Sequence, residues 1–183
     1  MIACLIFDLD GTLVDSSQAN VKSYGQAFNE LGLVFDAQKY ESLFGLRFPE
    51  IMDRIAPDTS ASQRDDIKKL KAKYYKQNLG LIQLNADLVE LARAAKSHYK
   101  IALVTTASKA NVRTLLEHFE LDGLFDKVIV GEDVKHGKPN PECYLLAARS
   151  FGFEPQDCLV FEDSQVGMEA ARAAGAKAVK VAI

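Results

Sequence analysis

The chain has 183 residues, of which 48% are hydrophobic and 26% are charged. That length suits one domain, or one domain with a modest insertion, and it buries about 70% of the unfolded surface without disulfide staples. A net charge of −3 argues against a nucleic-acid binder, which is usually basic. The three cysteines have no CxxC spacing, and their odd number favours a reducing compartment. With no targeting segment and no apolar run of membrane-spanning length, we expect a cytoplasmic protein that does not bind membranes.

The chain begins with a predicted buried strand over residues 2–7, an apolar run that is too short for a helix. Asp8 and Asp10 follow it. Since side chains alternate along an extended chain, the two carboxylates point to the same side, with Cα atoms about 6.5 to 7 Å apart. Such a pair needs a divalent cation, a shared proton or a nearby Lys or Arg, and each of these makes it a candidate for chemistry.

The segment from residue 15 to about residue 82 is predicted to be all-helical. Apolar residues recur there at helical spacing, and Ser, Pro and Gly stand where helices start and stop. Ser16 or Ser17 is the expected cap of the first helix. The predicted helices cover residues 17–31, 38–44, 49–56 and 60–78.

From residue 85 onward, predicted helices and strands alternate. Strands are expected at residues 101–104, 128–130, 159–161 and 178–181, with helices between them. This alternation indicates an α/β fold, a Rossmann-like parallel sheet covered on both faces, to which the first strand also belongs. We expect a core domain of residues 1–14 and 83–183 and an inserted helical cap domain of residues 15–82. The cap would lie at the carboxyl edge of the sheet, where open α/β sheets bind ligands.

Three more polar clusters follow predicted strands, and the first contains Thr105 and Thr106. Hydroxyls and free backbone N–H groups before a helix suit a phosphate dianion. The alternative is that both threonines belong to the strand and that Ser108 only caps the next helix.

Lys138 belongs to the second cluster, His136 to Glu142. Asn140 as N-cap and Pro141 at the first helical position explain half of this cluster structurally. Lys138 precedes a proline that stiffens the loop, and a fixed cation there would let Asp8 stay ionised beside Asp10. The alternative is a solvated loop lysine.

Glu162 and Asp163 form the third cluster, between a predicted strand and a predicted helix. Carboxylate oxygens are the ligands that Mg²⁺ prefers, together with a substrate phosphate. The alternative is an acidic N-cap, with Asp163 or Ser164 at the start of the helix.

Together the four clusters resemble the four motifs of the haloacid dehalogenase superfamily, beginning with Asp8-Leu9-Asp10-Gly11-Thr12 as its DxDGT signature. Within that superfamily the chain resembles the helical-cap phosphatases of the β-phosphoglucomutase and phosphoglycolate phosphatase group. The resemblance implies a Mg²⁺-dependent phosphatase that forms an aspartyl-phosphate. By this resemblance, Asp8 is the nucleophile, Asp10 is the general acid and base, and Lys138 also belongs to the catalytic residues. The phosphate is bound by Thr105, Thr106 and Lys138. The metal is held by Asp8, Asp10, Glu162 and Asp163.

The cap is expected to select a small phosphorylated metabolite, of the sugar phosphate or phosphoglycolate type. Arg47 lies in a loop between cap helices and is the candidate for contacting substrate, although a surface arginine is the alternative. Asn20 stands where related mutases place a histidine that delays hydrolysis, so hydrolysis is favoured. The alternatives are a phosphosugar mutase, a dehalogenase, disfavoured by Asp10, and a phospho-accepting signalling domain.

Overall fold

The centre of the molecule is a five-stranded parallel sheet with strand order β5-β4-β1-β6-β7, in a computed structural model that describes residues 1–183. The first strand of the chain lies in the middle of the sheet, and all four of its residues are buried. The expected α/β fold is therefore confirmed. The strands are β1 (Cys4–Phe7), β4 (Lys100–Val104), β5 (Lys127–Ile129), β6 (Cys158–Glu162) and β7 (Lys177–Lys180).

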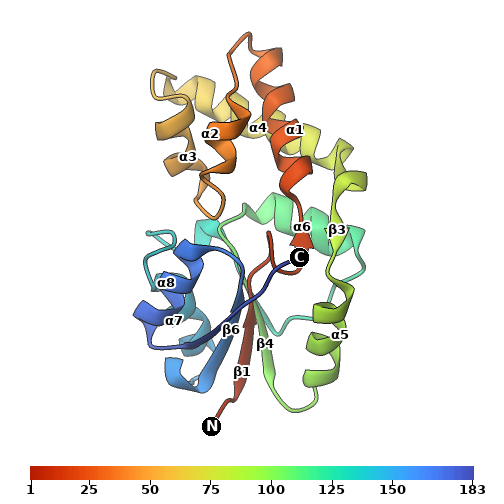
Figure 1. Cartoon of the computed structure of the whole chain (residues 1–183), viewed down its shortest axis with the longest axis vertical. Helices are drawn as coiled ribbons and strands as arrows, with labels where there is room; N and C mark the ends of the chain where they lie inside the picture. The colour runs from red at the N-terminus through yellow and green to blue at the C-terminus, as the bar shows by residue number, and fades with distance from the viewer.

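Helices cover both faces of the sheet (Figure 1). The alternation of side chains along β1 shows this directly. Leu5 and Phe7 pack into the apolar cluster shared with α5 (Ala86–Ala95) and α6 (Lys109–His118). Cys4 and Ile6 pack into the cluster shared with α7 (Glu142–Ser150) and α8 (Gln165–Ala174). A strand buried on both faces has to be apolar throughout, which is why residues 4–7 carry no polar side chain.

Four helices form the cap above the carboxyl edge of the sheet (Figure 1). They are α1 (Ser17–Glu30), α2 (Ala37–Glu41), α3 (Phe48–Ile55) and α4 (Ala61–Gln77), close to the helices that the sequence predicts. The cap has its own apolar cluster, which includes Tyr24, Phe28, Met52 and Ile67. Because a separate core is what an independent unit requires, we propose a cap domain of residues 15–82 on a core domain of residues 1–14 and 83–183.

Two short strands join the cap to the core. β2 (Val14–Asp15) and β3 (Gln83–Leu84) pair antiparallel, so the two linkers of the cap run side by side. The sequence indicates only linkers there, because strands of two residues leave no periodicity. Three short 3₁₀ helices complete the chain, η1 (Leu79–Leu81), η2 (Gly131–Asp133) and η3 (Pro155–Asp157). No helix combines the length and apolar character needed to cross a bilayer.

The start of α7 differs by one residue from the sequence-based expectation. The helix begins at Glu142 with Pro141 as its N-cap, whereas Asn140 was expected in that role. The side chain of Asn140 still accepts a hydrogen bond from the backbone N–H of Glu142, at 3.0 Å. The capping function is thus present, but from one position earlier.

Candidate active site

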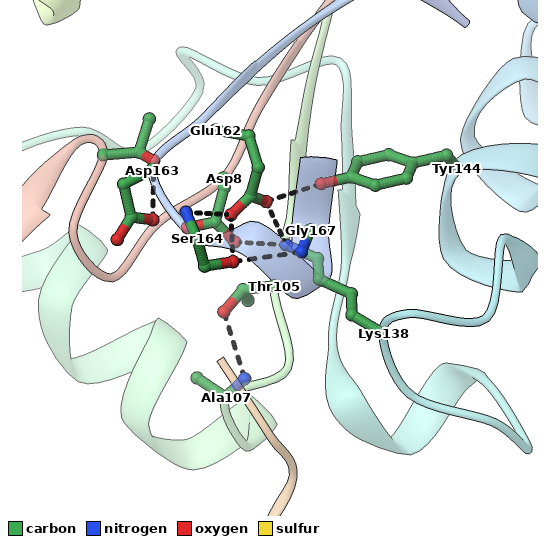
Figure 2. Close-up of polar contacts among 10 residues, drawn as sticks. Asp8, Thr105, Ala107, Lys138, Tyr144, Glu162, Asp163, Ser164 and Gly167 are labelled. Atoms are coloured by element: carbon green, nitrogen blue, oxygen red, sulfur yellow. Dashed lines mark hydrogen bonds and ion pairs between the residues drawn. The ribbon is translucent and has the colours of Figure 1, made fainter. Parts of the chain in front are cut away.

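The predicted polar clusters meet at the carboxyl edge of the sheet (Figure 2). Asp8 follows β1, Thr105 follows β4, and Glu162 and Asp163 close β6. Lys138 arrives from the loop between β5 and α7. Parallel strands place their carboxyl ends at one edge, so residues 130 positions apart lie in contact.

Lys138 bridges two carboxylates. Its Nζ donates to Oδ1 of Asp8 at 2.6 Å and to Oε2 of Glu162 at 2.6 Å. The lysine side chain is 2% exposed, and those of Asp8 and Glu162 are 7% and 1% exposed. A lysine that is buried this deeply between two acids is part of the site and not a solvated surface residue. The interpretation of Lys138 as a solvated loop lysine is therefore wrong.

The carboxylate of Glu162 is fully hydrogen-bonded. Oε1 accepts from the backbone N–H and the hydroxyl of Ser164, at 3.1 and 2.7 Å, and Oε2 accepts from the hydroxyl of Tyr144 at 2.7 Å as well as from Lys138. Gly167 makes room for this arrangement, since a Cβ there would lie 2.0 to 2.3 Å from the carboxyl atoms of Glu162. The expected role of Glu162 in holding metal is therefore secondary in this geometry to its role in holding Lys138.

Burial and neighbouring charges shift the pKa values of Asp8, Glu162 and Lys138 in different directions. Burial, and then the charge of Glu162, raise the pKa of Asp8 well above its ordinary value. Burial also penalises the charged form of Glu162, but the Lys138 ammonium and the hydrogen bonds from Ser164 and Tyr144 outweigh it and lower its pKa. For Lys138, burial disfavours the ammonium, yet the two carboxylates outweigh burial and raise the pKa. One ammonium thus cannot balance both acids, so a further cation is needed for Asp8 to be charged together with Glu162.

A metal-ion site fits the acids at this edge. Asp8, Glu162 and Asp163 each offer a carboxylate oxygen, and these oxygens lie within 4.8 Å of one another. Oδ2 of Asp8 and Oδ2 of Asp163 accept no hydrogen bond, while Oδ1 of Asp163 accepts from the hydroxyl of Thr12 at 3.3 Å. Gly11 has φ +90°, and a Cβ there would lie 2.2 Å from Oδ2 of Asp163. The glycine at position 11 therefore leaves space for the carboxylate of Asp163 beside that of Asp8. A bound cation would stabilise two carboxylates placed so close together.

Asp10 is held by the start of the cap. The hydroxyl of Ser16 donates to Oδ1 of Asp10, and Nδ2 of Asn20 donates to Oγ of Ser16 at 2.9 Å. Ser16 is the N-cap residue of α1, as expected, but its side chain makes no capping hydrogen bond because its hydroxyl is directed to Asp10. Sequence reasoning found Ser16 only as a helix cap and did not find its contact with Asp10.

Thr105 and Thr106 both line the cavity in front of Asp8. The hydroxyl oxygen of Thr105 accepts a hydrogen bond from the backbone N–H of Ala107 at 3.0 Å (Figure 2). Ser108 caps α6 by accepting from the backbone N–H of Asn111. The capping alternative for Ser108 is thus true, and it is compatible with a phosphate-binding role for Thr105.

A cavity of about 920 Å³ separates cap and core. Asp8, Asp10 and Asp163 form its floor, and cap residues that include Asn20, Tyr24, Tyr40, Lys71 and Tyr75 line its upper part. Arg47 is absent from the lining, although it was the cap residue expected to contact substrate, and Gly45, Leu46 and Phe48 beside it are present.

Lys71 is the buried lysine among those of α4 that line the cavity. It is 8% exposed and makes no ion pair, and its ammonium lies 4.1 Å from the ring centroid of Tyr75 and 5.5 Å from that of Tyr24. Burial lowers its pKa to about 8. The sequence shows many lysines on this helix and gives no signal that singles out Lys71, because its orientation depends on how α4 packs on α1.

Comparison with known proteins identifies the family of the chain. Residues 5–181 match the model of the haloacid dehalogenase-like hydrolase family. The chain belongs to this family. It is 32% identical to a fructose-1-phosphate phosphatase of Escherichia coli, over 98% of this chain and 96% of that protein. It is 30% identical to the CbbY protein of Rhodobacter capsulatus, over 97% and 84% of the two chains.

Solved structures of haloacid dehalogenase-like hydrolases have the same architecture. CbbY from Rhodobacter sphaeroides in complex with phosphate has a TM-score of 0.90 and 27% identity, covering 100% of this chain and 87% of that chain. A β-phosphoglucomutase from Clostridium difficile has a TM-score of 0.86 and 27% identity, covering 100% and 86%. The expected family and the expected enzyme class, a hydrolase of the phosphatase type, are both confirmed.

Proposed function

We propose that the protein is a Mg²⁺-dependent phosphatase that hydrolyses a phosphorylated sugar or similar small metabolite through an aspartyl-phosphate on Asp8. The observation that carries this proposal is the 2.6 Å contact between Nζ of Lys138 and Oδ1 of Asp8 at the floor of the cavity. The contact fixes one oxygen of Asp8 and leaves the other free of hydrogen bonds. A carboxylate held in this way is prepared for attack on phosphorus.

The first step transfers the phosphoryl group to Asp8. An oxygen of Asp8 forms a bond to phosphorus while the bond from phosphorus to the substrate oxygen breaks, and Asp10 gives its proton to that leaving oxygen. Lys138 and the hydroxyl and amide groups around Thr105 stabilise the charge on the phosphoryl oxygens. Ser16 keeps Asp10 oriented through its hydrogen bond.

The second step restores the enzyme. Water attacks the phosphorus, Asp10 takes a proton from the water, and the bond between phosphorus and Asp8 breaks to release inorganic phosphate. Asp10 therefore ends the cycle protonated, as it began. The Ser16 hydroxyl can follow both states because a hydroxyl donates or accepts as required.

The residues that would hold Mg²⁺ are Asp8 and Asp163 through their free oxygens, the main chain of Asp10, and Glu162 at the edge of the group. When bound, the ion neutralises the phosphate dianion and orients it for in-line attack. This assignment is supported by the three acids that approach within 4.8 Å and exceed the positive charge available from Lys138.

A sugar phosphate suits the upper part of the cavity. Tyr24, Tyr40, Tyr75 and Lys71, whose side chains carry hydroxyl and ammonium groups, line a space that is large enough for a phosphorylated sugar. Relatives named as a fructose-1-phosphate phosphatase and a phosphorylated carbohydrates phosphatase support the same class. Asn20, which bonds to Ser16, favours hydrolysis over the mutase alternative because it lacks the ionisable ring of histidine.

The test is a screen for phosphate release from sugar monophosphates, sugar bisphosphates and phosphoglycolate, with and without Mg²⁺. We expect sugar phosphates to be the best substrates and Asp8→Asn to lose at least about a thousandfold in kcat. Asp87→Asn, a change of the same kind at an exposed acid in α5, is the matched control and should keep full activity. Turnover by Asp8→Asn at the wild-type rate would overturn the proposal.

A further inference from the structure

The loop before α3 approaches the core from the cap. Gly45, Leu46 and Phe48 of this loop line the cavity, but Arg47 does not. The side chain of Arg47 leaves the cavity and crosses to the core, where it is 17% exposed. The residue expected to meet substrate thus makes a different contact.

Arg47 uses its guanidinium to join cap and core. Nη1 donates to the backbone carbonyl of Val134 at 3.1 Å, across 87 positions of sequence. Nε and Nη2 donate to Oε1 of Glu50 at 3.1 and 2.6 Å, so Glu50, one turn into α3, holds the guanidinium in place. We call the set Arg47, Glu50 and Val134 the Arg47 bridge.

The loop that receives the bridge also carries Lys138. Gly137 packs against the arginine, and a Cβ at this position would lie 2.7 Å from Nε of Arg47. The same loop is tied to α7, because the backbone N–H groups of Lys135 and His136 donate to the carboxylate of Glu142 at 2.8 and 2.9 Å. The loop that positions Lys138 is therefore held by the core on one side and by the cap on the other.

Two further contacts join the cap to the core away from the linkers. Gly45 packs against the start of α8, where a Cβ would lie 2.9 Å from Cγ2 of Val166. Lys68 and Glu132 form an ion pair at 4.0 Å, with side chains that are 52% and 46% exposed, and a pair so open to solvent contributes little. Away from the linker that carries Ser16, the Arg47 bridge is more buried than the Lys68–Glu132 pair, with an arginine side chain that is 17% exposed.

We propose that Arg47 is a positioning residue, which fastens the closed cap to the loop that carries Lys138, and that it does not bind substrate. In the closed state the guanidinium fixes the carbonyl of Val134, four residues before Lys138. Closure of the cap then stabilises the loop that holds Lys138 in contact with Asp8. The expected effect of Arg47 on catalysis rests on the proposed function, whereas its expected effect on the stability of the Lys138 loop does not.

The kinetic test compares two substrates of different size. Arg47→Ala and Gly137→Ala are assayed on the best sugar phosphate and on p-nitrophenyl phosphate, which has no sugar hydroxyls. Gly137→Ala displaces the guanidinium without removing its charge. We expect each variant to lose about tenfold in kcat/KM, and by the same factor on both substrates.

Two matched variants sharpen this comparison. Arg64→Ala removes a cap arginine that pairs with Asp53 at 2.6 Å within the cap, and it should leave both activities unchanged. Arg47→Lys keeps the charge but replaces the planar fork of guanidinium donors, which reaches Glu50 and Val134 from separate nitrogens, with a single ammonium nitrogen, and it should restore only part of the loss. A loss that is several times larger on the sugar phosphate, or no loss on either substrate, would overturn the role of Arg47 as a positioning residue.

The structural test measures backbone hydrogen exchange in residues 44–48 and 134–138. Arg47→Ala and Gly137→Ala should speed exchange in both segments, while Arg64→Ala should not. Unchanged exchange in residues 134–138 of both variants would overturn the proposal. Because exchange needs no substrate, this outcome is independent of whether the protein hydrolyses sugar phosphates.

Discussion

Gly167 controls how closely the acid that holds Lys138 approaches the start of α8. A Cβ at this position would lie within 2.3 Å of three carboxyl atoms of Glu162, which already accept four hydrogen bonds. Gly167→Ala should therefore push Glu162 away from Lys138, lower kcat at least tenfold and cost about 1 to 3 kcal/mol of stability. Gly80→Ala is the control, since a Cβ there meets nothing within 4 Å. Equal kcat values for the two variants would contradict this role of Gly167.

Lys71 gives the enzyme a predicted pH limit on the alkaline side. Burial lowers its pKa to about 8, so its ammonium loses charge as the pH rises through that value. If the ammonium binds hydroxyl or phosphate oxygens of the substrate, kcat/KM should fall above about pH 8. Lys71→Met, which keeps most of the side-chain volume, should have lower kcat/KM at pH 7 and no decline near pH 8. The pH profiles of the two proteins check this, and an unaltered decline in Lys71→Met would assign it to another group.

At the level of single residues, the sequence predicts the site residues that follow strands and does not predict those that lie on helices. Asp8, Thr105 and Asp163 are identifiable because each follows an apolar run, at the edge where parallel strands end together. Lys71 is one of several lysines in α4, and only tertiary packing decides which of them is buried. Tyr144 occurs among apolar residues of α7, and only tertiary packing brings its hydroxyl to Glu162. Arg47 was predicted from its loop position, but loop position alone does not determine on which side of the loop a side chain lies.

Among the elements, the paired strands β2 and β3 connect the cap to the loop that carries Asp10. Asn85 follows β3 and makes three relevant contacts. Its side chain caps α5 by accepting from the backbone N–H of Leu88 and donates to the carbonyl of Thr12 at 3.1 Å, and its backbone N–H donates to the carbonyl of Leu13 at 2.9 Å. Thr12 in turn donates to Asp163. The second linker of the cap is thus hydrogen-bonded to the loop that carries Asp10.

Replacing Asn85 should separate this link from simple helix capping. Asn85→Ala and Ser60→Ala each remove an N-cap, from α5 and α4 respectively, and each should lower the free energy of unfolding by about 1 kcal/mol. Only Asn85→Ala should also lower kcat severalfold, because Ser60 lies at the far end of the cap from the linkers. Urea unfolding and steady-state kinetics of the two variants check this. Equal kcat values would show that Asn85 only caps a helix.

The order and pairing of the elements are less predictable than their existence. The apolar run of residues 2–7 predicts β1, and the alternating pattern after residue 85 predicts β4, β5, β6 and β7, because each is an apolar run bounded by turn residues. The sequence does not predict that β1 lies between β4 and β6, since that depends on which strands pair in space. It also does not predict the β2–β3 ribbon, where pairing between two distant linkers, rather than local propensity, makes the strands.

For the whole molecule, the carboxyl edge of the sheet is a region where the arrangement of charges that the proposed function requires lowers the stability of the fold. Three carboxylates lie close together there, and two of them share the single ammonium of Lys138, where the core, the cap and the loop of Lys138 meet. The excess charge opposes folding, and any cation that binds only to the folded arrangement should offset that cost. Metal binding is therefore measurable through global stability, without reference to turnover.

We expect Mg²⁺ to raise the thermal midpoint of the protein. At a concentration one hundred times its dissociation constant, the ion would add about 2.7 kcal/mol, and a chain of this size gains about 2 to 4 °C per kcal/mol. Asp163→Asn should raise the midpoint without metal, because it removes one repelling charge, and should abolish most of the Mg²⁺ response. Asp87→Asn, at an exposed site on α5, should respond like the wild type. Thermal scans at matched ionic strength, with NaCl in place of MgCl₂, separate specific binding from screening. A Mg²⁺ response of equal size in Asp163→Asn and Asp87→Asn would place the metal elsewhere.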